Sequence, residues 1–155
     1  MQDDLIRQLG HSGRQNMRLI WEISGLDETK LSSEDRTLLE AMRLHPEYYD
    51  LWERLDEVTD EELQRDGTNP VLHVIIHQIV ENQVAANDPP ETAKMLERLR
   101  KGGLTRHEAL HKIGGVVTEE IFEIMKFRRV FDEQRYLKKL GRLGRSRRRR
   151  LKRRR

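Results

Sequence analysis

The chain has 155 residues, enough for one ordinary domain, and 37% of them are charged, 35% hydrophobic and 5% aromatic. It contains no cysteine, which excludes disulfide bonds and leaves nitrogen and oxygen as the ligands of any metal ion. The acidic start lacks the features of a signal peptide, and the longest apolar stretch, 71–80, is too short to span a bilayer, so we expect a cytoplasmic protein with no membrane partner.

The net charge of +3 combines two parts of opposite sign. Residues 138–155 contain 12 of the 30 Lys and Arg residues and no acidic residue. The remainder has 18 basic and 27 acidic residues, a net charge of −9. We therefore expect a helical domain over residues 1–137, with its core at about 33–127, followed by a basic tail over 138–155.

Helical spacing of apolar residues predicts a first helix over 14–23, ended by Ser24-Gly25. A sequence resembling a capping box begins at Ser32 and predicts a second helix that reaches about His45. Pro46 then begins a third helix, which extends to about Leu55. The acidic residues that follow it, 56–67, are expected to form a loop or a weak helix.

In the second half, Asn69-Pro70 predicts a central, mostly apolar helix over 70–86. A short amphipathic helix is expected over 90–101, and a capping box at Thr105 begins a longer helix over 105–127. A last short helix covers 133–140. Because no stretch alternates like a strand, we expect an all-α fold: a small helical bundle with two histidine-bearing central helices, followed by a disordered basic C-terminal tail.

Four of the six histidines form two pairs, and each pair has a spacing of four residues that places both side chains on one helical face. Helices that run up, down and up would bring the two pairs to about the same level. At an axis separation of ~8–10 Å, imidazoles from both helices could reach one ion. We therefore predict a site for zinc, iron or nickel, with Glu81 as a further ligand or as a hydrogen-bond partner of an imidazole. The predicted histidine ligands are His73, His77, His107 and His111.

Several features around these pairs leave alternatives open. Gly114-Gly115 predicts either a close helix contact or a kink. Glu119 lies about 18 Å along the helix from His107, too far to share its ion. With Glu120 and Glu123, it is predicted to serve a second position or a salt bridge. His45 is predicted to have a structural role.

His107-Glu108-x-x-His111 also matches the pattern of zinc proteases, in which the glutamate acts as a base. We disfavour a protease because the motif lies in the capped first turn of its helix, where Glu108 already has a capping role. If one coordination position is open, Glu108 or Glu81 could act as the base of a metal-dependent hydrolase. The opposing interpretation is that the histidines are hydrogen-bonded core residues.

Four groups of residues carry a resemblance to a known family. They are Leu44-His45-Pro46-Glu47-Tyr48, Thr68-Asn69-Pro70-Val71-Leu72-His73 with His77, Glu81 and Gln83, Asp88-Pro89-Pro90, and His107, His111 and Glu119. Over about residues 45–125 they resemble an uncharacterised bacterial family, domain of unknown function eighteen-forty-one. The resemblance implies a small all-helical bacterial protein with a histidine-rich centre, and it implies no activity. The Arg-rich end departs from the family pattern.

The density of like charge in the tail predicts disorder in isolation and suits contact with phosphates. We predict non-specific association with RNA, the ribosome or DNA, without sequence reading, because no aromatic residue follows Tyr136. The tail could instead be a solvated segment or fold against the acidic body. The predicted nucleic-acid-binding residues are Arg145, Arg147, Arg148, Arg149, Arg150, Lys152, Arg153, Arg154 and Arg155.

Two other functions remain open alongside metal binding. One is a non-enzymatic, nucleic-acid-associated accessory protein whose histidine core is purely structural. The other is an interaction module that uses the acidic segment 56–66.

Overall fold

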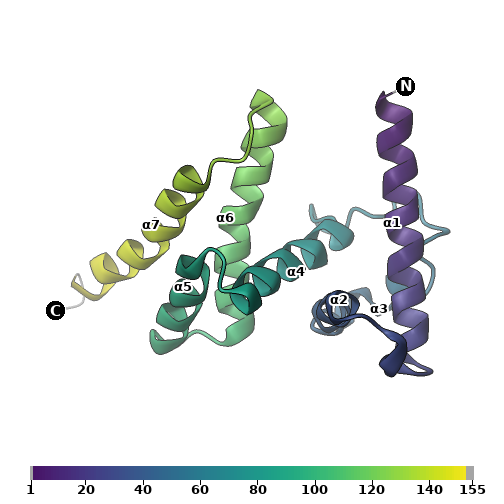
Figure 1. The fold of residues 1–155 in the computed structure, drawn as a ribbon, viewed down its shortest axis with the longest axis horizontal. Helices are drawn as coiled ribbons and strands as arrows, with labels where there is room; N and C mark the ends of the chain where they lie inside the picture. Colours follow the sequence, from purple (N-terminus) through teal and green to yellow (C-terminus); the bar gives the residue numbers. More distant parts are fainter. Residues whose placement is uncertain (1, 153–155) are drawn as a thin grey trace. The chain divides into compact units, whose positions relative to one another are not determined.

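The structure is a computed structural model that describes the backbone of residues 2–152 and the side chains of residues 13–144. Over this range the chain forms α-helices and two short 3-10 helices and contains no strand (Figure 1), which confirms the prediction of an all-α protein. The chain divides into two compact units, residues 1–78 and 79–155. The boundary falls inside α4 (Pro70–Ala86), within the stretch expected to be a single helical domain.

The first unit is built around one buried indole. The side chain of Trp52 is fully buried, and its Nε1 donates a hydrogen bond to the carbonyl of Met42 at 3.4 Å. Apolar side chains of the surrounding helices and of the first turns of α4, including Val74, complete this core. The elements are α1 (Gln2–Ser24), η1 (Glu28–Lys30), α2 (Ser33–Arg43), η2 (Pro46–Tyr48) and α3 (Tyr49–Trp52).

In this unit, the capping residues predicted the helix boundaries more accurately than the spacing of the apolar residues did. The hydroxyl of Ser32 accepts a hydrogen bond from the backbone of Asp35 at 3.1 Å, as predicted for the start of α2. The third helix ends at Trp52 rather than at Leu55, and α1 begins far earlier than predicted. The helix α1 continues through Gly10 and Gly13, although glycine is a weak helix former.

The acidic segment after α3 is partly neutralised within its own unit. Asp56 accepts a hydrogen bond from Arg18 at 2.9 Å, and Asp60 pairs with Arg14 at 2.7 Å. Both arginines belong to α1. Part of the acidic segment is therefore bound to α1 in the folded chain.

The second unit contains the rest of α4 together with α5 (Pro90–Lys101), α6 (Arg106–Phe127) and α7 (Glu133–Lys152), and the last three helices pack on one another. A polar contact ties α4, α5 and α7 together. The buried hydroxyl of Tyr136 donates to Oε1 of Gln83 at 2.8 Å, and the hydroxyl of Thr92 donates to the same oxygen at 2.9 Å. Burial raises the pKa of Tyr136, so its phenol remains a hydrogen-bond donor at neutral pH.

Ion pairs join α6 to α7. Glu120 is buried, and both of its oxygens lie 3.0 Å from Nε of Arg135, which lowers the pKa of the carboxyl. Lys139 approaches Glu120 at 3.5 Å, Glu123 at 3.3 Å and Glu119 at 3.9 Å. Of the two roles predicted for these glutamates, the structure shows the salt bridge.

The glycine pair of α6 was predicted to allow a close helix contact or to kink the helix. Gly115 is exposed, and a Cβ added to it would meet no atom within 4 Å. Gly114 is buried, and its carbonyl accepts a hydrogen bond from the hydroxyl of Thr118 at 2.9 Å. The prediction of a backbone approach too close for a side chain is therefore wrong at Gly115.

The last helix runs past the predicted end at Leu140 and reaches Lys152, with Tyr136 and Leu140 on its buried face. Residues 138–144, assigned by charge to the tail, belong to the described part of α7. The side chains of 145–155, which carry the nucleic-acid prediction, lie outside the described residues. In the part of the chain that the structure describes, every helix is too short or too polar to cross a membrane.

Candidate metal centre

The first unit contains a buried histidine that the sequence analysis assigned to a structural role. His45 lies between α2 and η2, and its Nδ1 is 2.8 Å from the carbonyl oxygen of Ala41. Because a carbonyl can only accept, Nδ1 carries the hydrogen of the neutral ring and the lone pair lies on Nε2. This arrangement is typical of metal-binding histidines, whose second nitrogen is fixed by a backbone acceptor.

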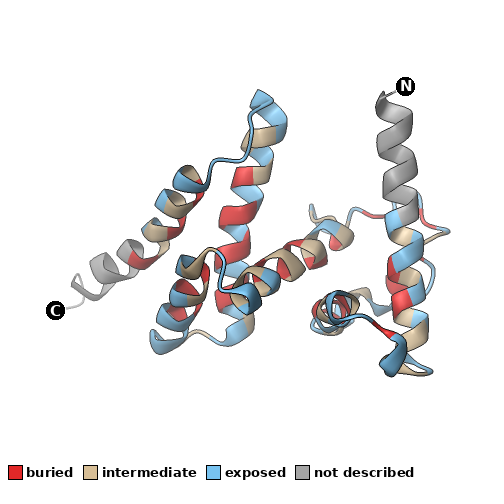
Figure 2. Cartoon of the chain, viewed as in Figure 1, coloured by how far each residue is buried: buried red, intermediate tan, exposed pale blue. Residues whose placement is uncertain are grey.

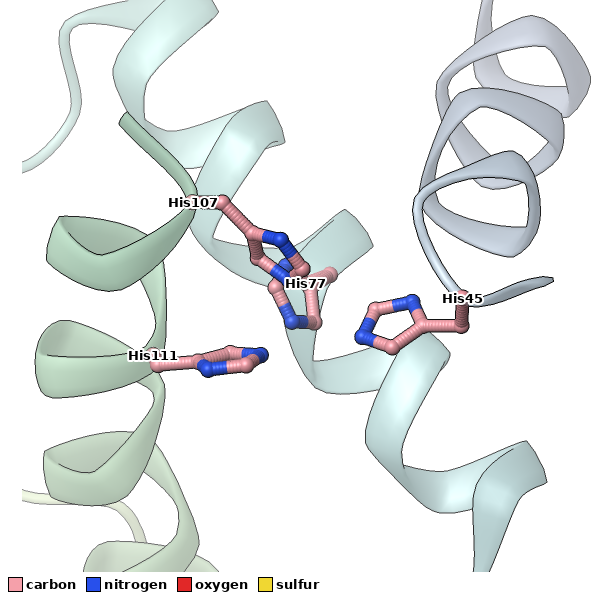
Figure 3. Close-up of side chains that lie close together, drawn as sticks. All are labelled: His45, His77, His107 and His111. Atoms are coloured by element: carbon pink, nitrogen blue, oxygen red, sulfur yellow. The ribbon is translucent and has the colours of Figure 1, made fainter. Parts of the chain in front are cut away.

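Two of the predicted ligands lie beside this ring. Nε2 of His73 is 2.9 Å from Nε2 of His45, so His73 donates that hydrogen bond. The ring of His77, which is also buried, lies 4.9 Å from His45 and 5.0 Å from His73 between centroids. The three imidazoles therefore form one cluster inside the first unit, and Figure 3 shows His45 and His77 with the elements that carry them.

The other two predicted ligands form a pair in the second unit. His107 and His111 lie in the first two turns of α6, with ring centroids 4.3 Å apart (Figure 3). His111 is exposed and His107 is half-buried. The spacing of four residues thus brings the rings together as predicted.

Each unit offers two ring nitrogens suited to a metal ion. The nitrogens of His45 and His77 lie within 4.8 Å of each other, and the same limit holds for His107 and His111. Neutral imidazole is a common ligand of zinc, iron and nickel. Each pair could therefore supply ligands for a metal ion, and the first pair contains His45 in place of the predicted His73.

The two carboxylates predicted near the site have other partners. Glu81 forms an ion pair with Arg106, within the second unit. Glu108 accepts hydrogen bonds from the backbone and hydroxyl of Thr105 at 2.8 and 3.0 Å, which lowers the pKa of its carboxyl. A capping carboxylate of lowered pKa is a weaker base, so the geometry disfavours Glu108 as the base of a hydrolase.

The sequence contained one signal that would have found His45. It stands in Leu44-His45-Pro46, the first of the segments that carry the family resemblance. Periodicity gave His45 no partner, because the second helix was expected to end there. Its contact with His73 joins residues 28 positions apart, which spacing along one helix does not predict.

The chain was compared with known proteins at the level of families, curated sequences and solved structures. No curated protein and no solved structure matches it. One family matches residues 12–142, a longer stretch than the quoted segments span. The chain belongs to the family described as Domain of unknown function (DUF1841).

Proposed function

We propose that the protein binds one transition-metal ion through imidazoles from both units. The ligands are His45 and His77 of the first unit and His107 and His111 of the second. Each pair already holds its nitrogens within 4.8 Å, so little reorganisation is needed inside either unit. Four nitrogen ligands complete the tetrahedral coordination that zinc prefers, and iron and nickel accept the same donors.

The observation that carries this proposal is the hydrogen bond from Nδ1 of His45 to the carbonyl of Ala41 at 2.8 Å. It fixes the ring of a buried histidine and leaves the lone pair of Nε2 on the side that faces His73. A histidine that only filled the core would not need its second nitrogen among two further imidazoles.

In this proposal His45 takes the place predicted for His73. The lone pair of His45 Nε2 either accepts the hydrogen bond of His73 or binds the ion, because it cannot do both. His73 therefore holds the ring of His45 in position before the ion arrives. Its distance of 2.9 Å from His45 is that of a hydrogen bond.

The ion pair between Glu81 and Arg106 is an argument for a site that takes ligands from both histidine pairs. Glu81, which binds Arg106, follows His77 by one turn of the same helix. Arg106 directly precedes His107. A start of α6 held at Glu81 favours participation of His107 in a site that contains His77.

A site of four imidazoles leaves no open position for water and is expected to be structural rather than catalytic. The capping role of Glu108 and the ion pair of Glu81 agree with this expectation. We therefore propose metal binding and assign no reaction to the site.

Elemental analysis of protein purified without a histidine tag tests the proposal. We expect about one ion per chain for the wild type, and a large loss of ion in His45→Gln and His111→Gln. His73→Gln is the matched control, since its amide can still donate to His45, and it should retain the ion. Less than ~0.2 ion per chain, with no thermal shift on adding zinc, iron or nickel, would refute the proposal.

A second proposal concerns residues 145–155, which carry the predicted nucleic-acid-binding residues and which we call the basic segment. The helix α7, anchored by buried Tyr136 and Leu140, continues to Lys152 and so carries the folded unit directly into the basic residues. Non-specific contact with the phosphates of RNA or DNA is the role that this charge supports best. A chain ending at Gly144 keeps the packed part of α7 and should lose most of its affinity, and wild-type binding should weaken steeply with salt. Nucleic-acid binding that persists in the shortened chain and at raised salt would exclude the basic segment as the binding site.

A further inference from the structure

The end of α6 and the loop before α7 expose aromatic side chains. The chain has three phenylalanines, and all of them lie here with 51% to 59% of their surface accessible. Figure 2 shows this end of α6 and the loop as exposed. A protein with so few aromatic residues is not expected to expose all its phenylalanines in one place without a partner. They are Phe122, Phe127 and Phe131.

Cations lie against these rings. The ammonium of Lys126 is 5.3 Å from the centroids of both Phe122 and Phe127, and the guanidinium of Arg129 is 4.9 Å from the centroid of Phe127. Residues 124–131 contain three basic residues and no acidic one. We call the three phenylalanines, with Lys126, Arg128 and Arg129, the aromatic tip.

The acidic residues next to the aromatic tip are already engaged. Glu123 accepts from Lys139 at 3.3 Å and also pairs with Arg129 at 3.5 Å. Asp132, the residue before α7, accepts a hydrogen bond from the backbone of Arg135 at 3.1 Å. The three basic residues of the aromatic tip outnumber these two carboxylates, so the net charge offered to a partner is positive.

Rings flanked by cations fit a partner that has flat aromatic groups and negative charge. In single-stranded nucleic acid, a base can stack on one face of a ring while the cation beside that ring meets a phosphate. Insertion into a lipid bilayer would draw the ammonium of Lys126 into hydrocarbon with the rings, which is costly. A symmetric contact with a second copy would place the same cations opposite one another.

We infer that the aromatic tip binds single-stranded RNA or DNA by stacking bases on Phe122 and Phe127, with Lys126 and Arg128 contacting the phosphates. This deepens the proposal for the basic segment and rests on it for the class of partner. It assigns a different contribution to each part. The basic segment supplies affinity for any polyanion, and the aromatic tip supplies the preference for unpaired bases.

The test uses the full chain and labelled oligonucleotides of about ten nucleotides: oligo-U, oligo-dT and a duplex of the same length. The double substitution of Phe122→Leu and Phe127→Leu keeps apolar side chains and removes the rings. We expect it to weaken single-strand binding by about 10-fold or more, and to change duplex binding by less than about twofold. Comparison of oligo-U with oligo-dT separates RNA from DNA.

Two matched variants make the outcome decisive. Val130→Ser removes an exposed apolar side chain without a ring and should leave single-strand affinity unchanged. Replacing residues 147–150 by Gln should weaken single-strand and duplex binding alike if the basic segment acts as proposed, and should have no effect if that proposal fails. Whether or not the glutamine variant loses binding, the effect of the Phe122→Leu and Phe127→Leu double variant can be measured separately, because both phenylalanines lie in the folded unit outside the basic segment.

Wild-type affinity in the leucine variant, or an equal loss in Val130→Ser, would overturn the stacking role. Binding to vesicles of anionic lipid that is weakened by the leucines, with single-strand affinity unchanged, would assign the aromatic tip to a membrane instead. Because the substituted side chains are exposed, the variants should keep the wild-type melting temperature, and circular dichroism checks this.

Discussion

A backbone carbonyl of the preceding helix, α2, determines the tautomer of His45. The carbonyl of Ala41, four residues earlier, fixes the hydrogen on Nδ1, and this leaves Nε2 to be shared between His73 and an ion. This single hydrogen bond therefore makes Nε2 of His45 the nitrogen that can bind an ion in the candidate site.

Glu120 should make stability depend on pH. Hydrogen bonds from Arg135 lower the pKa of its carboxyl in the folded chain, so its contribution is complete above the unfolded value of about 4.3 and is lost as pH falls through the lowered folded value. Glu120→Gln should cost about 2 kcal/mol at neutral pH, because buried hydrogen bonds to a charged partner are lost. Denaturant unfolding followed by circular dichroism at neutral pH and below pH ~4 measures both effects, and the difference from wild type should shrink in acid.

Glu119 provides the control for that comparison. Its side chain is 69% exposed, and its oxygen lies 3.9 Å from Lys139. Glu119→Gln should change stability by less than about 0.5 kcal/mol. An equal loss of unfolding free energy in the two variants would show that burial does not increase the contribution of Glu120 to stability.

Gly115 offers a stabilising substitution. Its site is helical and exposed, and an added Cβ meets no atom within 4 Å, so Gly115→Ala should stabilise the chain by about 0.5–1 kcal/mol. Gly144→Ala should not give this gain, since its Cβ would lie 3.0 Å or less from the guanidinium of Arg98. Thermal unfolding of both variants checks the contrast, and destabilisation by Gly115→Ala would reveal a contact that the backbone does not show.

At the scale of the elements, the start of α6 combines a cap with a pair of candidate ligands. Thr105 and Glu108 form a reciprocal capping box, and His107 and His111 follow on the first two turns. Thr105→Ala should cost about 1 kcal/mol of stability through the lost cap. Glu108→Gln preserves the capping geometry and should keep both stability and bound metal.

Metal content and thermal unfolding of the two cap variants separate the roles of this segment. A loss of metal in Glu108→Gln, with stability unchanged, would assign the carboxylate to the site rather than to the cap. A loss of stability with metal retained is the result expected for Thr105→Ala.

Helix positions followed from the sequence where capping chemistry was explicit. Ser32, Thr105 and the proline at the start of α4 marked the starts of helices correctly, since a cap satisfies a particular backbone group. The extent of α1 and α7 was underestimated, because glycines and a dense charge run have low or ambiguous local preference. Tertiary anchors such as Tyr136 decide such boundaries, and they are not visible in a local window.

On the scale of the whole molecule, the parts of the candidate site that depend on local sequence were predicted, and those that depend on contacts between helices were missed. Both pairs with a spacing of four were found, because helical periodicity acts within one element. His45 was missed because its hydrogen-bond partner His73 lies 28 residues away in another helix, and the ion pair of Glu81 was missed because Arg106 also belongs to another helix. Contacts between elements depend on packing, which periodicity alone does not determine.

The two tryptophans allow a test of metal binding across the whole molecule. Trp21 and Trp52 both belong to the first unit, so tryptophan fluorescence reports the unfolding of that unit. If the ion takes ligands from both units, His111→Gln in the second unit should abolish most of the metal-induced rise in the melting temperature seen by fluorescence. In the wild type, an excess of metal of about 100-fold over the dissociation constant should stabilise the first unit by about 2.7 kcal/mol. A rise that persists in His111→Gln but disappears in His45→Gln would place the ion on the histidine cluster of the first unit alone, and the proposed contribution of α6 would then be wrong.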